Sequence, residues 1–258
     1  MNVLIKFFAT AIIKIPFACA FISYFLRIAP NFGSVNNFRM KLLKTLSDHF
    51  GADPARTQRI QFGKSSHLYI NFSEKYGEMI FDKNIASSDT LDFMNDFLDP
   101  GDCFVDAGSG AGLFSIFAAE KVGRDGHVYS FESDAKAFNQ LTINKDSNKF
   151  DYQMHAFNFG LHGSQAENSV VVKTFDIFAS EMNIRHIDLL KIDTREALHD
   201  TLEGMQRTFL EIGPRALIVE IESDAPLVSW INERGYESKI LEKTDPERGL
   251  VNMLFVKP

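Results

Sequence analysis

Cysteine is scarce in this chain, with only Cys19 and Cys103 among 258 residues. Because the two lie far apart and Cys103 begins an apolar, strand-like run, we expect no disulfide framework and a reducing compartment. Internal repeats and low-complexity linkers are also missing, which excludes a repeat architecture. Tryptophan occurs once against 25 phenylalanines, most of which we expect in the core.

Net positive charge is confined to the first 50 residues. That segment has six lysines and arginines against one aspartate, a net charge of +5, so the remaining residues carry −12 of the total of −7. An acidic main domain lacks the basic footprint of a nucleic-acid-binding protein, and we therefore predict no nucleic-acid partner. The basic start of the chain indicates contact with an anionic surface instead.

Residues 1–30 are strongly apolar, but Lys14 and Pro16 interrupt the run. Three arrangements compete: a helix pair lying on a membrane or on the domain itself, a spanning helix, and a signal peptide cleaved near residues 18–20. We favour the first, because a lysine and a proline near the middle suit neither of the others. This predicts a cytoplasmic protein with peripheral membrane contact through residues 1–30.

From residue 85 onward, strand-like and helix-like runs alternate. The expected strands are 103–107, 127–131, 152–157, 187–192, 216–221, 237–241 and 250–256, and the expected helices are 88–98, 112–122, 134–145, 175–182, 196–210 and 225–234. Such alternation predicts an α/β fold with a doubly wound, mostly parallel seven-stranded sheet, closed by an antiparallel pair. We divide the chain into a helical N-terminal extension (1–55), lead-in strands and a helix (56–98), and the main domain (99–258).

Three glycines at alternate positions follow the first strand of this sheet. Gly108, Gly110 and Gly112 follow Asp106 and Ala107, and an apolar helix-like run begins at Leu113. Glycine allows a sharp turn and a close approach of the backbone to a ligand, and the N–H groups of the following helix start face the same crevice. An acidic residue before the glycines attracts an ammonium group, so the pattern favours S-adenosyl-L-methionine as the cofactor.

A second acidic residue, Glu132, ends the next strand, where it suits a ribose diol. We also assign Ser133 and Phe157, which follow or end neighbouring strands, to the cofactor site. The alternative is a dinucleotide site, which uses a similar glycine turn with an acidic residue about 20 positions later. The GxGxG spacing lacks the third glycine of GxGxxG, and the carboxylate of Asp106 would repel a pyrophosphate.

These residues resemble the FkbM family of S-adenosylmethionine-dependent methyltransferases over about 68–222. The best matches are 99–108, 128–132, and 172–176 followed by Ile187-Asp188-Leu189-Leu190-Lys191-Ile192-Asp193. The resemblance implies a Rossmann-like class I methyltransferase that methylates hydroxyl oxygens, often on sugars or secondary metabolites. We therefore expect an enzyme whose partner is a small-molecule or glycan acceptor; its oligomeric state is left open.

The chain departs from this family at 194–198, where Thr-Arg-Glu-Ala-Leu replaces the usual Val-Glu-Gly-Ala-Glu, and its 158–170 segment is short. Ser133 also replaces a common proline. These differences motivate an alternative function, in which a catalytically degenerate methyltransferase fold binds cofactor or a partner without turnover.

Asp193, at the end of the fourth strand, is the candidate catalytic base, and the alternative is that it caps the following helix. Glu222 is a weaker candidate for binding the acceptor. We predict no metal, since no histidines have convincing ligand spacing; those considered are His155, His162 and His186. Asp193 with Glu220 or Glu222 could still hold a divalent cation through oxygen ligands.

Overall fold

The computed structural model describes residues 57–61, 64–71, 88–161, 163, 172–194, 197–223, 226–245 and 248–258. The chain divides into two compact units, residues 1–57 with 71–78 and residues 58–70 with 79–258, and nearly all described residues belong to the second. The predicted apolar segment 1–30 lies outside the described residues, and the predicted division at residues 55 and 98 stays a prediction. Within the described ranges, no helix has the length and apolar character needed to cross a membrane.

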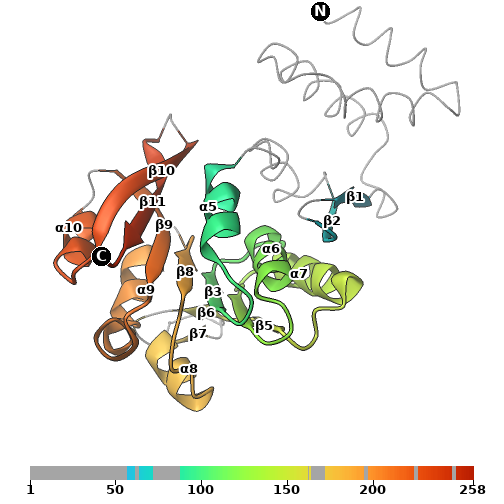
Figure 1. Cartoon of the computed structure of the whole chain (residues 1–258), viewed down its shortest axis with the longest axis horizontal. Helices are drawn as coiled ribbons and strands as arrows, with labels where there is room; N and C mark the ends of the chain where they lie inside the picture. The colour runs from blue at the N-terminus through green and yellow to red at the C-terminus, as the bar shows by residue number, and fades with distance from the viewer. Residues whose placement is uncertain are drawn as a thin grey trace, which may run out of the picture. The chain divides into compact units, whose positions relative to one another are not determined.

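Strands and helices alternate through the second unit (Figure 1). The strands are β1 (Thr57–Gln61), β2 (His67–Asn71), β3 (Cys103–Ala107), β4 (His127–Phe131), β5 (Met154–Phe157), β6 (Gly160–Leu161), β7 (Val172–Lys173), β8 (Leu189–Ile192), β9 (Ala216–Glu222), β10 (Glu237–Asp245) and β11 (Leu250–Val256). The helices are α5 (Asp89–Phe97), α6 (Leu113–Val122), α7 (Ala135–Asn148), α8 (Phe175–Glu181), α9 (Leu198–Glu203), the π-helix η4 (Thr208–Ile212) and α10 (Pro226–Asn232).

Seven strands form one sheet in the order β10-β11-β9-β8-β3-β4-β5. The five strands from β9 to β5 are parallel, whereas β11 pairs antiparallel with both β9 and β10. The predicted α/β fold with a mostly parallel seven-stranded sheet and a closing antiparallel pair is therefore confirmed. Strand order reverses between β3 and β8, and in open α/β sheets ligands bind outside the carboxyl ends of the strands at such a point.

Helices cover both faces of the sheet. Val105 of β3 and Phe131 of β4 belong to a core cluster shared with Phe178 of α8 and Leu202 of α9, while α6 and α7 contact β3, β4 and β5 from the other side. All five residues of β3 are buried. A strand covered on both faces has to be apolar along its whole length, so a charged residue within such a strand is exceptional.

The predicted helix over 196–210 is instead two short helices. α9 ends at Glu203, with Gly204 as its C-cap, and the π-helix η4 begins at Thr208. The carboxylate of Asp176 on α8 accepts hydrogen bonds from the N–H groups of Arg207 (2.9 Å) and Thr208 (2.8 Å) and from the Thr208 hydroxyl (2.7 Å). A contact from a remote helix thus holds the start of η4, which local helix propensity could not reveal.

Candidate functional site

The glycine turn after β3 leaves no room for larger residues. Gly108, Gly110 and Gly112 all have positive φ, at 85°, 55° and 93°. A Cβ atom at position 108 would lie 2.1 Å from the carbonyl oxygen of Asp193, and one at position 112 would lie 2.5 Å from Cδ1 of Leu141. Two of the three glycines are therefore required both by backbone conformation and by the close approach of β8 and α7.

Glu132 braces this turn from the end of β4. One carboxylate oxygen accepts a hydrogen bond from the N–H of Gly110, and the other accepts one from the N–H of Asp134, both at 2.8 Å. The side chain is buried, and this burial raises the pKa of Glu132 against the lowering effect of the two N–H groups. Each carboxylate oxygen keeps a second lone pair, so the predicted ribose contact is compatible with the bracing role and stays a prediction.

Asp106 lies on β3 beneath the glycine turn and is 0% exposed. Its Oδ2 accepts a hydrogen bond from the Ser115 hydroxyl at 2.5 Å, and Ser115 accepts one from the Ser130 hydroxyl at 2.8 Å. Burial raises the pKa of Asp106 to about 6, even though nearby Lys191 and the Ser115 bond act to lower it. Its other oxygen, Oδ1, is buried without a hydrogen-bond partner within the described part of the chain.

Lys191 completes a charged row with Asp106, Asp193 and Glu220. It is a register partner of Asp106 on the neighbouring strand, is 1% exposed, and donates from Nζ to Oδ2 of Asp193 at 3.2 Å. Its ammonium group also lies 4.6 Å from the centroid of the Phe114 ring. Burial lowers the pKa of Lys191, but Asp193, Asp106 and Glu220 together raise it above its usual value, so the lysine is charged at neutral pH.

Asp193 is the more accessible carboxylate of the two that flank Lys191. Its side chain is 18% exposed, and its N–H donates to the Ala107 carbonyl at 2.8 Å, which ties the ends of β8 and β3 together. The N-cap residue of the next helix, α9, is Ala197. Asp193 therefore does not occupy the capping position that the sequence left open as an alternative.

The remaining predicted cofactor residues lie beside this turn. Ser133 is exposed directly after Glu132. The ring of Phe157 stacks on Phe131 at 5.4 Å between centroids and meets Phe178 edge-on at 4.9 Å. The Phe157 ring is thus partly buried and packs against the aromatic core. Its carbonyl accepts a hydrogen bond from the N–H of Glu132 at 3.1 Å and fixes the end of β4.

Lys191 is a site residue that was not predicted from the sequence, although it lies within the segment that resembles the family motif. The sequence does contain a sign that this lysine is unusual. It lies inside an apolar run, Leu189-Leu190-Lys191-Ile192, in a strand that is expected to be buried. Buried charges of this kind are normally paired. The pairing partners could not be identified without the register between β3 and β8.

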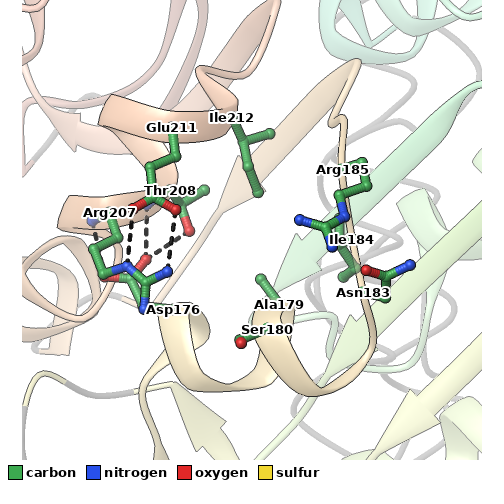
Figure 2. Close-up of a pocket in the computed structure, with 10 residues that line it drawn as sticks. All are labelled: Asp176, Ala179, Ser180, Asn183, Ile184, Arg185, Arg207, Thr208, Glu211 and Ile212. Carbon is green, nitrogen blue, oxygen red and sulfur yellow. Dashed lines mark hydrogen bonds and ion pairs between the residues drawn. The ribbon is translucent and has the colours of Figure 1, made fainter.

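Two other features lie apart from the glycine turn. A pocket of about 150 Å³ lies between α8 and η4. Figure 2 shows that Asp176 is hydrogen-bonded to Thr208 beside this pocket and that Arg207 is paired with Glu211. None of the residues that line the pocket is a predicted site residue.

On α9, potential metal-ligand atoms of His199, Asp200 and Glu203 lie within 4.8 Å of one another, the only such group among the described residues.

Comparison with known proteins gives similarity in fold at low identity. No protein-family model matches the chain, and no curated protein sequence matches it. Among solved structures, an rRNA methylase from Streptococcus thermophilus has a TM-score of 0.49 and 15% identity over 65% of this chain and 93% of that chain. The methyltransferase FkbM from Methylobacillus flagellatus KT has a TM-score of 0.48 and 13% identity over 73% and 56%.

A third similar structure is TYW2 from M. jannaschii in complex with AdoMet, with a TM-score of 0.44 and 16% identity over 78% of this chain and 87% of that chain. With TM-scores below 0.5, these similarities identify neither the reaction nor the acceptor. An rRNA methylase is among these structures, so the comparisons do not support the prediction, based on net charge, that the chain has no nucleic-acid partner.

We expect Gly108→Ala to destabilise the protein far more than Gly101→Ala. Both positions have a positive φ, at 85° and 96°, but only a Cβ at position 108 meets another atom within 4 Å. The backbone cost of about 1–2 kcal/mol is common to both, and overpacking adds about 1–3 kcal/mol at position 108. Urea denaturation of both variants measures the difference. Equal losses would show that Gly108 does not face a closed contact.

We expect Asp106 to make stability fall as pH rises from about 4 to about 6. The native carboxyl keeps its proton up to a pKa of about 6, whereas the unfolded chain releases it near the ordinary value of 3.8. Between these values the native state binds more protons, so its free energy of unfolding decreases with rising pH. In Asp106→Asn this component, about 3 kcal/mol for the full shift, is absent.

The measurement is urea denaturation at pH 4.5 to 7.5 for wild type, Asp106→Asn and the exposed control Asp151→Asn. The stability difference between Asp106→Asn and wild type should grow in favour of the variant up to about pH 6 and then level off. Parallel pH profiles for all three proteins would contradict the raised pKa of Asp106.

Proposed function

We propose that this chain is an S-adenosylmethionine-dependent methyltransferase that transfers a methyl group to a hydroxyl oxygen. The observation that carries the proposal is the chemistry of the glycine turn: it lies at the point where strand order reverses, and carboxylates end or follow three adjacent strands around it. These are Asp106 on β3, Glu132 after β4 and Asp193 after β8. Such a group of carboxylates suits a ligand that carries an ammonium and a sulfonium group.

The residues present fit this cofactor better than a dinucleotide. The free Oδ1 of Asp106 is a buried acceptor next to the turn, and an unpaired buried acceptor is costly unless a ligand or its charge compensates it. A pyrophosphate in the same place would face the carboxylates of Asp106 and Glu132 at short range. Positively charged groups are stabilised there by the same Coulomb interaction that would repel phosphates.

Each predicted cofactor residue has a distinct task in this proposal. Asp106 attracts the amino-acid end of the cofactor by its charge, and Gly108, Gly110 and Gly112 supply the positive-φ backbone that lets the turn bend sharply beside the ligand. Glu132 would accept hydrogen bonds from the ribose hydroxyls through its remaining lone pairs. Ser133 and the backbone at Phe157 border the same edge of the sheet.

Asp193 is the residue proposed to act on the acceptor. When bound, S-adenosylmethionine supplies an activated methyl group whose carbon–sulfur bond breaks as the new carbon–oxygen bond forms. The hydroxyl proton of the acceptor passes to the Asp193 carboxylate, which is partly exposed while its Oδ2 is held by Lys191. Holding the carboxylate in one orientation aligns it with the acceptor, and alignment contributes much of the rate in such displacements.

For the acceptor we propose a hydroxyl group of a saccharide or a related metabolite. The support is the resemblance of residues 99–108, 128–132 and 187–193 to the FkbM family, together with the acidic net charge of the main domain. A polyanionic acceptor would pay an electrostatic cost at this surface. RNA is nevertheless included among the acceptors tested below.

Calorimetric titration with S-adenosylhomocysteine tests the cofactor site. Wild type is expected to bind it with micromolar affinity, whereas Asp106→Ala should raise the Kd about 30-fold or more, because a buried charged partner contributes about 2–3 kcal/mol. The exposed control Asp151→Ala should bind like wild type. A folded wild-type protein that binds NAD but not S-adenosylhomocysteine would refute the proposal in favour of a dinucleotide site.

Transfer of a radiolabelled methyl group tests the reaction and the role of Asp193. With glycan, lipid-glycan and total RNA pools as acceptors, we expect label in a saccharide-containing pool, and Asp193→Asn should lower the rate by about 10²–10⁴-fold. The Kd for S-adenosylhomocysteine should stay within about threefold, since Asp193 acts on the acceptor. Asp151→Asn, at an exposed aspartate that belongs to no proposed site, is the matched control and should retain activity.

Each other outcome of the transfer assay has a defined meaning. Label in RNA alone would overturn the saccharide acceptor while leaving methyl transfer intact. Binding of S-adenosylhomocysteine without transfer to any pool would favour the alternative function, a degenerate fold that binds cofactor without turnover. An unchanged rate in Asp193→Asn would remove Asp193 as the base.

A further inference from the structure

Helix α7 carries three amide side chains at four-residue spacing: Gln140, Asn144 and Asn148, here called the amide ladder. Residues four apart lie one above the other on one face of a helix, separated by about 6 Å along the axis at 1.5 Å per residue. Alternate residues of a strand are separated by about 6.6 Å. The amide ladder therefore matches the spacing of the backbone groups that one edge of a strand presents.

The amide ladder forms hydrogen bonds with the backbone of β2. The amide of Asn148 accepts from the N–H of His67 (3.0 Å) and donates to its carbonyl (2.7 Å). Asn144 accepts from the N–H of Tyr69 (2.7 Å), and Gln140 donates to the Tyr69 carbonyl (2.6 Å). The side chains of a helix thus take the place that a neighbouring strand would have beside β2.

Asn144 differs from the other two amides because it has a second partner in the glycine turn. Its Nδ2 donates to the carbonyl of Ala111 at 2.8 Å, and the side chain is 0% exposed. The orientation of this amide follows from chemistry, since the Tyr69 N–H requires an acceptor and the Ala111 carbonyl requires a donor. One buried amide therefore connects β2 to the glycine turn.

The Ala111 carbonyl lies within the glycine turn, between Gly110 and Gly112 in the chain. The N–H of Gly110 is bonded to Glu132, and the N–H of Gly112 donates to the carbonyl of Ser109 at 2.9 Å. Asn144 holds the Ala111 carbonyl, which lies between these two N–H groups along the chain. It thereby fixes the orientation of the peptide that joins Ala111 to Gly112. A turn held in its binding conformation in advance loses less entropy when a ligand binds.

We propose that Asn144 is a positioning residue for the cofactor, and that β2 supports the cofactor site through it. This inference rests on the proposed function. A merely structural role would affect only the stability of the fold, because the buried Tyr69 N–H and Ala111 carbonyl would lose a partner. A positioning role also changes the affinity of the folded protein for the ligand.

The test compares Asn144→Ala with its matched control Asn148→Ala by titration with S-adenosylhomocysteine at a temperature where both variants are folded by circular dichroism. Both substitutions remove bonds to the β2 backbone, but only Asn144→Ala removes the bond to the turn. We expect the Kd to rise about tenfold in Asn144→Ala and to change less than twofold in Asn148→Ala. Equal Kd values for the two variants would overturn the inference.

If Asn144→Ala does not fold, Asn144→Ser and Asn148→Ser replace the pair, with the increase in melting temperature caused by S-adenosylhomocysteine as the readout. A smaller increase for Asn144→Ser than for Asn148→Ser supports the inference, and equal increases overturn it. A wild-type protein that does not bind S-adenosylhomocysteine overturns the proposed function and this inference together. Wild-type binding with no difference between the variants overturns the inference alone.

Discussion

The carboxyl edge of the sheet depends on the buried ammonium group of Lys191. Removing such a charge from water costs several kcal/mol, which is recovered only when oppositely charged groups surround it closely. Asp106 and Asp193 provide this from β3 and from the end of β8, with Glu220 on β9. The carboxylates would in turn repel one another without the lysine. Three adjacent strands are therefore held in a register in which the cation and the carboxylates meet, since any slip would leave a buried charge without its partners.

The glycine turn is fixed by the same neighbours. The carbonyl of Phe131 accepts hydrogen bonds from the N–H groups of Gly108 and Ser109, both at 3.0 Å, and Glu132 holds Gly110 from the next position along β4. On the other side, Asp193 approaches Gly108 so closely that no Cβ fits. The carboxylate of Glu132 and the backbone carbonyl of Asp193 thus shape the turn, which places the dipoles of the predicted site before any ligand arrives.

The sequence was sufficient to predict the parallel sheet, its closing antiparallel pair and the position of the glycine turn, because buried strands and glycine spacing are local signals. The sequence was not sufficient to predict features that depend on contacts between residues far apart in the chain. The break between α9 and η4 depends on Asp176, more than 30 residues earlier in the chain. The amide ladder of α7 meets β2 across 71 to 81 residues, and its four-residue spacing was readable whereas its partner was not. The charged row likewise needed the register of β3 against β8, which no single strand contains.

The two carboxylates that flank Lys191, those of Asp106 and Asp193, differ in solvent exposure, and this difference underlies the roles proposed for them. Asp106 is fully buried and bonded to Ser115, so it can influence a ligand mainly through its charge, which falls off slowly with distance in a poorly solvated interior. Asp193 is 18% exposed and is held by Lys191 through Oδ2, so an acceptor hydroxyl can reach it directly. A proton acceptor must touch the group that it deprotonates, whereas a counter-charge need not touch the cation that it stabilises. In the proposed function, the single lysine therefore supports a counter-charge on one side and a candidate base on the other, and the difference in burial is the reason for assigning these two roles as we do.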